Sequence, residues 1–117
     1  MKNFKELKIW KKGMDIAVSC FQLTESFPST EKFGITSQIN RAGVSIPSNI
    51  AEGSSRSSEK DYQRFIEISL GSSFELETQL MIAQSLNFGD KTILNKLIAD
   101  ISEEQKMLSG FLKSINK

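Results

Sequence analysis

The sequence contains no histidine and only one cysteine, Cys20, among its 117 residues. Without histidine the chain cannot form a serine–histidine–aspartate triad, a histidine-ligated metal site or a histidine general base. One cysteine forms neither an intramolecular disulfide nor a thiolate zinc site, so we interpret Cys20 as a small core residue. No spacing of Asp, Glu, Ser or Lys pairs a nucleophile with a base. We therefore expect no enzymatic activity, no cofactor, no bound metal and no small-molecule substrate.

Long apolar runs are also missing. Apolar residues make up 38% of the chain, and charges interrupt every run long before the roughly 20 residues that cross a bilayer. The first residues lack the apolar core of a signal peptide, so we expect a cytoplasmic protein without membrane contact. The length is typical of one domain, and we predict a single domain over residues 1–117.

Neither sign of charge is in excess, because 15 Lys and Arg stand against 14 Asp and Glu, a net charge of +1. Nucleic-acid-binding domains are usually strongly basic, so any contact with phosphates would be local. The basic residues concentrate near the N-terminus, where the acidic residues are Glu6 and Asp15. The candidate phosphate contacts are Lys2, Lys5, Lys8, Lys11 and Lys12. Lysines on a surface helix more often only increase solubility, which is the favoured interpretation.

Apolar residues recur at intervals of three and four, as in amphipathic α-helices, and no segment alternates like a strand. The first stripe comprises Leu7, Trp10, Met14, Ala17, Phe21 and Thr24, widened by Val18. The second comprises Ile35, Ile39, Ala42, Ile46 and Ile50. The third comprises Tyr62, Phe65, Ile66, Ser69, Ser73, Leu76, Leu80 and Ala83. The fourth comprises Ile93, Leu94, Leu97, Ile98, Ile101, Met107, Leu108, Phe111, Leu112 and Ile115.

Turn residues separate the four stripes. Pro28 is expected to end the first helix, and the serine-rich run 53–58 forms a turn in which Ser58 caps the third helix. Gly89 suits a left-handed cap before Asp90 begins the fourth. Short connections make consecutive helices antiparallel neighbours, so the sequence predicts an all-α fold, an antiparallel up-down-up-down four-helix bundle.

Pro47 lies inside the second stripe. A proline in a helix clashes with the carbonyl four residues earlier, and that residue is Gly43, which leaves the backbone room to bend. We predict one helix that continues through Pro47 with a bend. The alternative is two short helices that meet at Ile46-Pro47.

A polar line runs along the second helix, and it is either a solvated face or part of a contact. It comprises Gln38, Arg41, Ser45, Asn49, Glu52 and Arg56. In an antiparallel hairpin with the third helix, facing residues would have numbers that sum to roughly 115. That register places Arg41 opposite Glu75 and Gln38 opposite Glu77. We predict that Arg41 contacts Glu75 or Glu77, as an interhelical clamp rather than an interface wall.

Three further features allow two interpretations each. Small residues on the second and third helices, including Gly43, Ser48 and Gly71, allow close packing within the chain or against a neighbouring subunit. Trp10 and Val18 of the first helix and the broad apolar face of the fourth, with Leu97-Ile98 and Phe111-Leu112, predict partial exposure and self-association; a wider core is the alternative. Asp100, Glu103 and Glu104 resemble an acidic metal site but lack its histidines, so we interpret them as a solvated face.

The run from Ser37 to Gly53, SQINRAGVSIPSNIAEG, resembles the signature of the four-helix-bundle proteins encoded in intervening sequences of bacterial 23S ribosomal RNA genes. Gly43 stands where that family commonly has alanine or another small residue. The similarity extends to Trp10, Phe27-Pro28, Glu31, Phe33-Gly34, Gly71-Ser72 and the run 75–80.

The resemblance implies a four-helix bundle that forms a homo-oligomer, expected to be a pentameric ring. It also implies a relationship to the accessory proteins of diversity-generating retroelements, which are thought to bind nucleic acid and a reverse transcriptase. We therefore expect a non-enzymatic oligomeric module that binds RNA or a nucleoprotein partner. The alternative is a protein-interaction scaffold that binds no nucleic acid.

Overall fold

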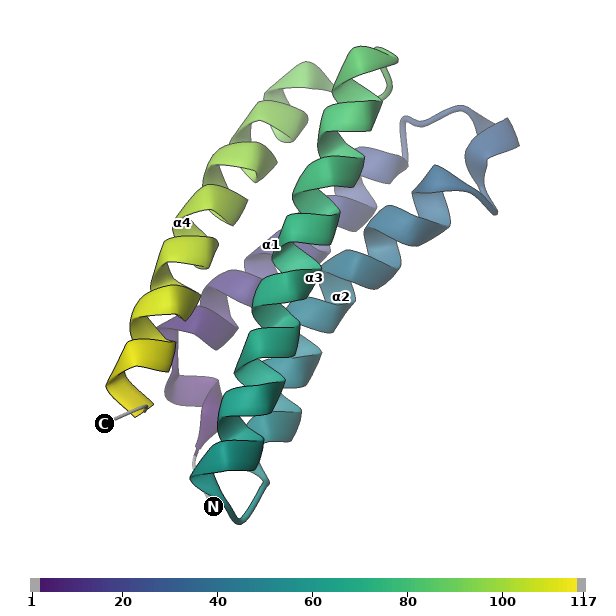
Figure 1. Cartoon of the computed structure of the whole chain (residues 1–117). Coiled ribbons are helices and arrows are strands. Elements are labelled where there is room, and N and C mark those ends of the chain that lie inside the picture. Colours follow the sequence, from purple (N-terminus) through teal and green to yellow (C-terminus); the bar gives the residue numbers. More distant parts are fainter. Residues whose placement is uncertain (1–2, 116–117) are drawn as a thin grey trace.

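The computed structural model describes residues 3–115, which form four α-helices and, within that range, no strand (Figure 1). The helices are α1 (Lys8–Thr24), α2 (Ile35–Ser54), α3 (Glu59–Ser85) and α4 (Lys91–Ile115), with short 3₁₀ turns η1 (Phe4–Glu6) and η2 (Ser29–Glu31). Helices α1 and α3 each pack against both α2 and α4, around one core. The predicted all-α class and the four helices are confirmed. No helix among the described residues is long and apolar enough to span a membrane.

The helix ends follow the local signals in the sequence. The Ser58 side chain accepts a hydrogen bond of 3.1 Å from the backbone N–H of Asp61, which caps α3 as expected. Between α3 and α4, Gly89 has a φ of +83°, and a Cβ atom there would lie 2.7 Å from Leu23 Cδ1. Glycine is therefore required both by the backbone conformation and by the close approach of α1.

Helix α2 runs without interruption from Ile35 to Ser54 with Pro47 inside it. The predicted continuous helix is confirmed and the alternative of two short helices is wrong; the bend stays a prediction. The structure gives Gly43 a packing role that the sequence did not indicate. A Cβ atom on it would lie 2.8 Å from the Sγ atom of buried Cys20, so its missing side chain lets α1 and α2 approach closely.

The core contains the predicted apolar residues of α2 and α3 almost without change. In α4, Leu94, Leu97, Ile101 and Leu108 are buried, and the remaining apolar residues of its stripe are half-buried against the core. None of the exposed large apolar residues of the described chain belongs to α4. The expectation of an exposed apolar face on α4 is therefore wrong, because this helix supplies the wider core instead.

The buried face of α1 differs from the predicted stripe. Met14 and Phe21 are 39% and 49% exposed, and Val18 is also exposed. The residues that α1 buries are Ile9, Gly13, Ile16, Ala17, Cys20, Leu23 and Thr24. Two adjacent apolar stripes follow this helix, and the sequence pattern alone does not say which of them meets the core. The larger side chains, Met14 and Phe21, are on the outer stripe.

Candidate protein-interaction surfaces

Ten large apolar residues of the described chain are exposed, and they gather in two places. Five lie on or between α1 and α2: Met14, Val18, Phe21, Phe33 and Val44. The other five lie along α3 or at its end, and we call them the α3 outer face: Ile68, Phe74, Met81, Ile82 and Leu86. Such gathering is unlike the scattered single apolar residues of an ordinary surface.

The first group lines a depression that we call the α1–α2 groove, made of two adjoining hollows of about 370 and 810 Å³. Its apolar part is lined by Trp10, Met14, Ala17, Val18, Phe21, Phe33, Val44, Pro47 and Ala51. Small side chains such as Ala17, Ser48 and Ala51 leave the space between larger ones. The segment that joins α1 to α2 projects away from the bundle (blue, Figure 1) and carries Phe33, which is 91% exposed.

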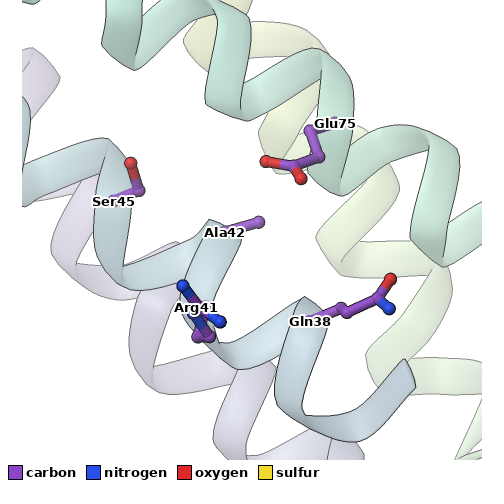
Figure 2. Close-up of a pocket in the computed structure, with 5 residues that line it drawn as sticks. All are labelled: Gln38, Arg41, Ala42, Ser45 and Glu75. Atoms are coloured by element: carbon purple, nitrogen blue, oxygen red, sulfur yellow. The ribbon is translucent and has the colours of Figure 1, made fainter. Parts of the chain in front are cut away.

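A polar recess of about 310 Å³ lies beside the groove, between α2 and α3. Figure 2 shows Gln38, Arg41, Ala42 and Ser45 on α2 and Glu75 on α3 around this recess. Among the described residues, Arg41 forms no ion pair with Glu75 or Glu77. The predicted clamp is wrong, although the hairpin register did bring Arg41 and Glu75 to the same recess.

Glu77 was predicted to face α2, but it contacts α4. Its Oε1 atom accepts a hydrogen bond of 3.1 Å from Gln105 Nε2 of α4. Glu75 and Glu77 are two positions apart, about 200° around a helix, so they cannot both face α2. Gln38, its expected partner, is exposed at the recess.

Serines join α2 to α3 where the clamp was expected. The hydroxyl groups of Ser45 and Ser72 are 2.8 Å apart, and Ser69 Oγ donates to the carbonyl oxygen of Ile46 at 2.9 Å. Asn49 Nδ2 extends this network by donating to Ser45 Oγ at 2.9 Å. Buried hydroxyl groups that are hydrogen-bonded in this way fix the helix register at little cost, since each replaces a bond to water.

The end of the polar line is solvated, as the simpler interpretation expected. Arg56 Nη2 lies 2.8 Å from Glu52 Oε2, one helical turn apart, and both side chains are substantially exposed. The Arg56 guanidinium also lies 4.7 Å from the centroid of the Phe65 ring. An exposed pair of this kind contributes about 0.3–0.5 kcal/mol.

The candidate phosphate-binding lysines do not act as one group. Lys5, Lys8 and Lys11 are exposed, whereas Lys2 lies outside the described residues. Lys12 is half-buried, and its Nζ atom lies 3.4 Å from Asp100 Oδ1 and 3.6 Å from Glu103 Oε1 of α4. Partial burial opposes ionisation of Asp100, but Lys96 and Lys12 hold its pKa below the ordinary value. The charge of Lys12 is therefore balanced within the chain.

Glu104 is a buried acid that the sequence pattern placed on a solvated face, which is wrong. Its side chain is fully buried, and neither carboxyl oxygen has a hydrogen-bond partner. Gly13 provides the space: a Cβ atom there would lie 3.2 Å from Glu104 Oε2. Burial raises the pKa of Glu104 to about 8; Lys12 opposes this shift and Glu103 adds to it. The carboxyl group is therefore mainly protonated at neutral pH.

The thiol of Cys20 is enclosed in the core. Cys20 is fully buried, and burial raises the pKa of its thiol to about 12, so the nucleophilic thiolate is scarce at neutral pH. This agrees with its interpretation as a core residue. Within residues 3–115 no group of three or more Cys, Asp or Glu side chains is placed to hold a metal ion.

Fold and surfaces together define a class: a small four-helix protein whose exposed apolar side chains gather in one groove and along one helix. Residues 5–110 match the family described as 23S rRNA-intervening sequence protein, and the chain belongs to that family. The family resemblance of the α2 signature is thus confirmed.

A solved structure supports the fold. It is the crystal structure of a protein of unknown function from the S23 ribosomal protein family of Bacteroides thetaiotaomicron. The TM-score is 0.80 at 23% sequence identity, over 90% of this chain and 98% of that chain. Identity at this level supports a common fold and nothing more. No curated protein matches the sequence.

Proposed function

We propose that this protein is a non-enzymatic helical-bundle module that assembles with further copies of itself through the α1–α2 groove. The observation that carries the proposal is the exposure of Met14, Val18, Phe21 and Val44 in one continuous depression. Water contact with apolar surface is unfavourable by about 25 cal/mol per Å², so covering these side chains would favour association. The family resemblance favours a pentamer.

We also infer that consecutive helices alternate in direction, which makes the fold an up-down-up-down bundle. This is supported by contacts between α2 and α3, where residue numbers rise on one helix as they fall on the other. Ser45 contacts Ser72, and Gly53 lies against Phe65. Contacts between the other neighbouring helices follow the same inverse order.

The proposal that the chain is not an enzyme has two supports. Its one thiol is enclosed and protonated, and the one carboxyl group of residues 3–115 with a strongly raised pKa, Glu104, is sealed inside the core rather than open to a cleft. A perturbed acid without access to a substrate is a structural feature.

Trp10 gives a direct test because it is the only tryptophan and lines the groove. Val44 is exposed on the opposite wall, so Val44→Asp should disfavour association without damaging the core. We expect the emission of Trp10 to shift to longer wavelength in Val44→Asp, as in the highly diluted wild type. The control is Ala99→Asp at an exposed site of α4. Identical emission from wild type and Val44→Asp at every concentration would show that the groove is uncovered.

Binding of RNA is a second candidate, favoured by one observation. Lys5, Lys8 and Lys11 are exposed near the start of α1, and none of them forms an ion pair within the described residues. Contact of three lysines with single-stranded RNA would give a slope of about −2 for log affinity against log salt concentration. A salt series with wild type and Lys8→Glu/Lys11→Glu measures this slope. No binding at low salt would eliminate this candidate and leave the assembly proposal unaffected.

A further inference from the structure

The α3 outer face is a second apolar surface that the chain leaves open. Phe74 and Met81 are 51% and 54% exposed, although both lie well inside a helix that buries Leu76 and Leu80 on its other side. A helix that is apolar on two sides is typical of one that is covered on both. The fold covers only the side that faces the core.

We propose that the α3 outer face of one copy docks into the α1–α2 groove of a second copy. This inference rests on the proposed self-assembly and names the surface on the other side of the contact. The groove and the α3 outer face share no residue, so the contact is head to tail. Each copy then offers one free groove and one free α3 face, and repetition around one axis closes a ring.

The two surfaces lie at matching levels along the bundle. The contacts of Ser45 with Ser72 and of Gly53 with Phe65 place facing residues of α2 and α3 at numbers that sum to 117 and 118. Val44 and Phe74, whose numbers also sum to 118, are therefore at about the same level. In a ring whose axis is parallel to the helices, copies meet without a vertical offset. Phe74 of one copy would thus meet the groove near Val44 of the next.

Charged residues of opposite sign lie at equal levels along the groove and along α3. The groove has Arg41 toward one end and Glu52 toward the other. By the same register, α3 carries Glu75 at the level of Arg41 and Arg64 at the level of Glu52. Among the described residues Arg41, Glu75 and Arg64 form no ion pair within the chain, so these three remain available to a neighbour, whereas Glu52 already pairs with Arg56 at the exposed end of the groove. Opposite charges at equal levels would steer the two surfaces into this register.

Gly71 is consistent with a close neighbour on this side of α3. It is exposed in the middle of the helix, and a Cβ atom on it would have nothing within 4 Å in the chain. Glycine inside a helix is unfavourable relative to alanine, and packing within the chain does not account for it. Gly110 of α4 is equally open and serves as its matched control.

A mixing experiment tests the pairing of the two surfaces. Val44→Asp blocks the groove but keeps the α3 outer face, whereas Phe74→Asp does the reverse; both sites are exposed, and circular dichroism checks that each variant is folded. We expect each variant alone to be a monomer by light scattering. Mixed together, they should form a 1:1 dimer of about 26 kDa, twice the 13.1 kDa chain, and no larger species, because only one intact groove and one intact face remain.

The outcomes separate this inference from the proposed function. A Phe74→Asp variant that assembles like wild type while Val44→Asp does not would overturn the pairing and leave the groove as the interface. Two monomeric variants that stay monomeric when mixed would also overturn it. A monomeric wild type would defeat the assembly proposal itself. Should either aspartate variant be unfolded, Gly71→Ala tests the α3 outer face without a mixing experiment. We expect Gly71→Ala to weaken assembly at least tenfold and its matched control, Gly110→Ala, to leave assembly unchanged. Equal assembly of the two alanine variants would contradict the inference.

Discussion

At the residue scale, Glu104 shows how packing between distant helices sets the state of an acid. Glu104 lies inside the core beside Gly13, where a Cβ atom would come within 3.2 Å of its Oε2 atom, and without a hydrogen-bond partner the charged form is costly. Nothing local in the sequence indicates the contact between Gly13 and Glu104, because the two residues are 91 positions apart (104 − 13). The acidic run 103–104 looks like any solvated helix face.

Burial of Glu104 predicts that stability depends on pH. Its pKa is raised from 4.5 in the unfolded chain to about 8 in the folded protein, so the unfolded chain loses this proton first. The free energy of unfolding should therefore fall as pH rises from about 4.5 to about 8, by at most about 1.4 kcal/mol per pH unit, and then level off. Urea unfolding of wild type and Glu104→Gln at several pH values measures this.

The Glu104→Gln variant cannot ionise, so it should lose this component of the pH dependence and exceed wild type in stability at pH 8. Every other titratable group is present in both proteins, so the difference between the two curves reports the charge of Glu104. Parallel stability curves for the two proteins between pH 5 and pH 8 would mean that Glu104 is ionised in the folded state.

At the element scale, the core-facing stripes of α2 and α3 were predicted correctly. The stripe of α2 and most of that of α3 are buried as expected, and α2 continues through Pro47. For α1 the prediction failed because this helix has two apolar stripes, and the identity of the buried one depends on which neighbours it meets. Arg41 shows a related limit. The hairpin register placed Arg41 and Glu75 at the same recess, but whether the two side chains meet depends on their rotamers, which helix geometry alone does not determine.

The contact between α1 and α2 predicts that the effect of a substitution at Gly43 depends on residue 20. In wild type, Gly43→Ala would place a methyl group 2.8 Å from Cys20 Sγ, and overpacking of this kind costs about 1–3 kcal/mol. In a Cys20→Ala background the sulfur is gone and the nearest atom is the Cβ of residue 20, at 3.3 Å, so the same change should cost much less, and the higher helix propensity of alanine, about 1 kcal/mol, offsets part or all of that cost. Thermal unfolding of the four proteins in this double-mutant cycle measures the coupling. Equal effects in both backgrounds would contradict the packing described here.

At the scale of the whole molecule, the apolar residues of this chain exceed what its own core covers. The core takes one side of each helix, and the α1–α2 groove and the α3 outer face remain open. The sequence indicated the excess and attributed it to Trp10 and Val18 of α1 and to the broad face of α4. Val18 is indeed exposed, whereas Trp10 is half-buried and the apolar face of α4 proved to be core. Composition reveals surplus apolar residues, whereas their location depends on how the helices rotate against each other.

Self-assembly is the central claim, and the mass of the purified wild-type protein by light scattering at micromolar concentration tests it most directly. The account predicts a species several times heavier than the 13.1 kDa chain, close to five times that mass if the ring is the pentamer that the family resemblance favours. A single species near 13.1 kDa at that concentration would contradict it.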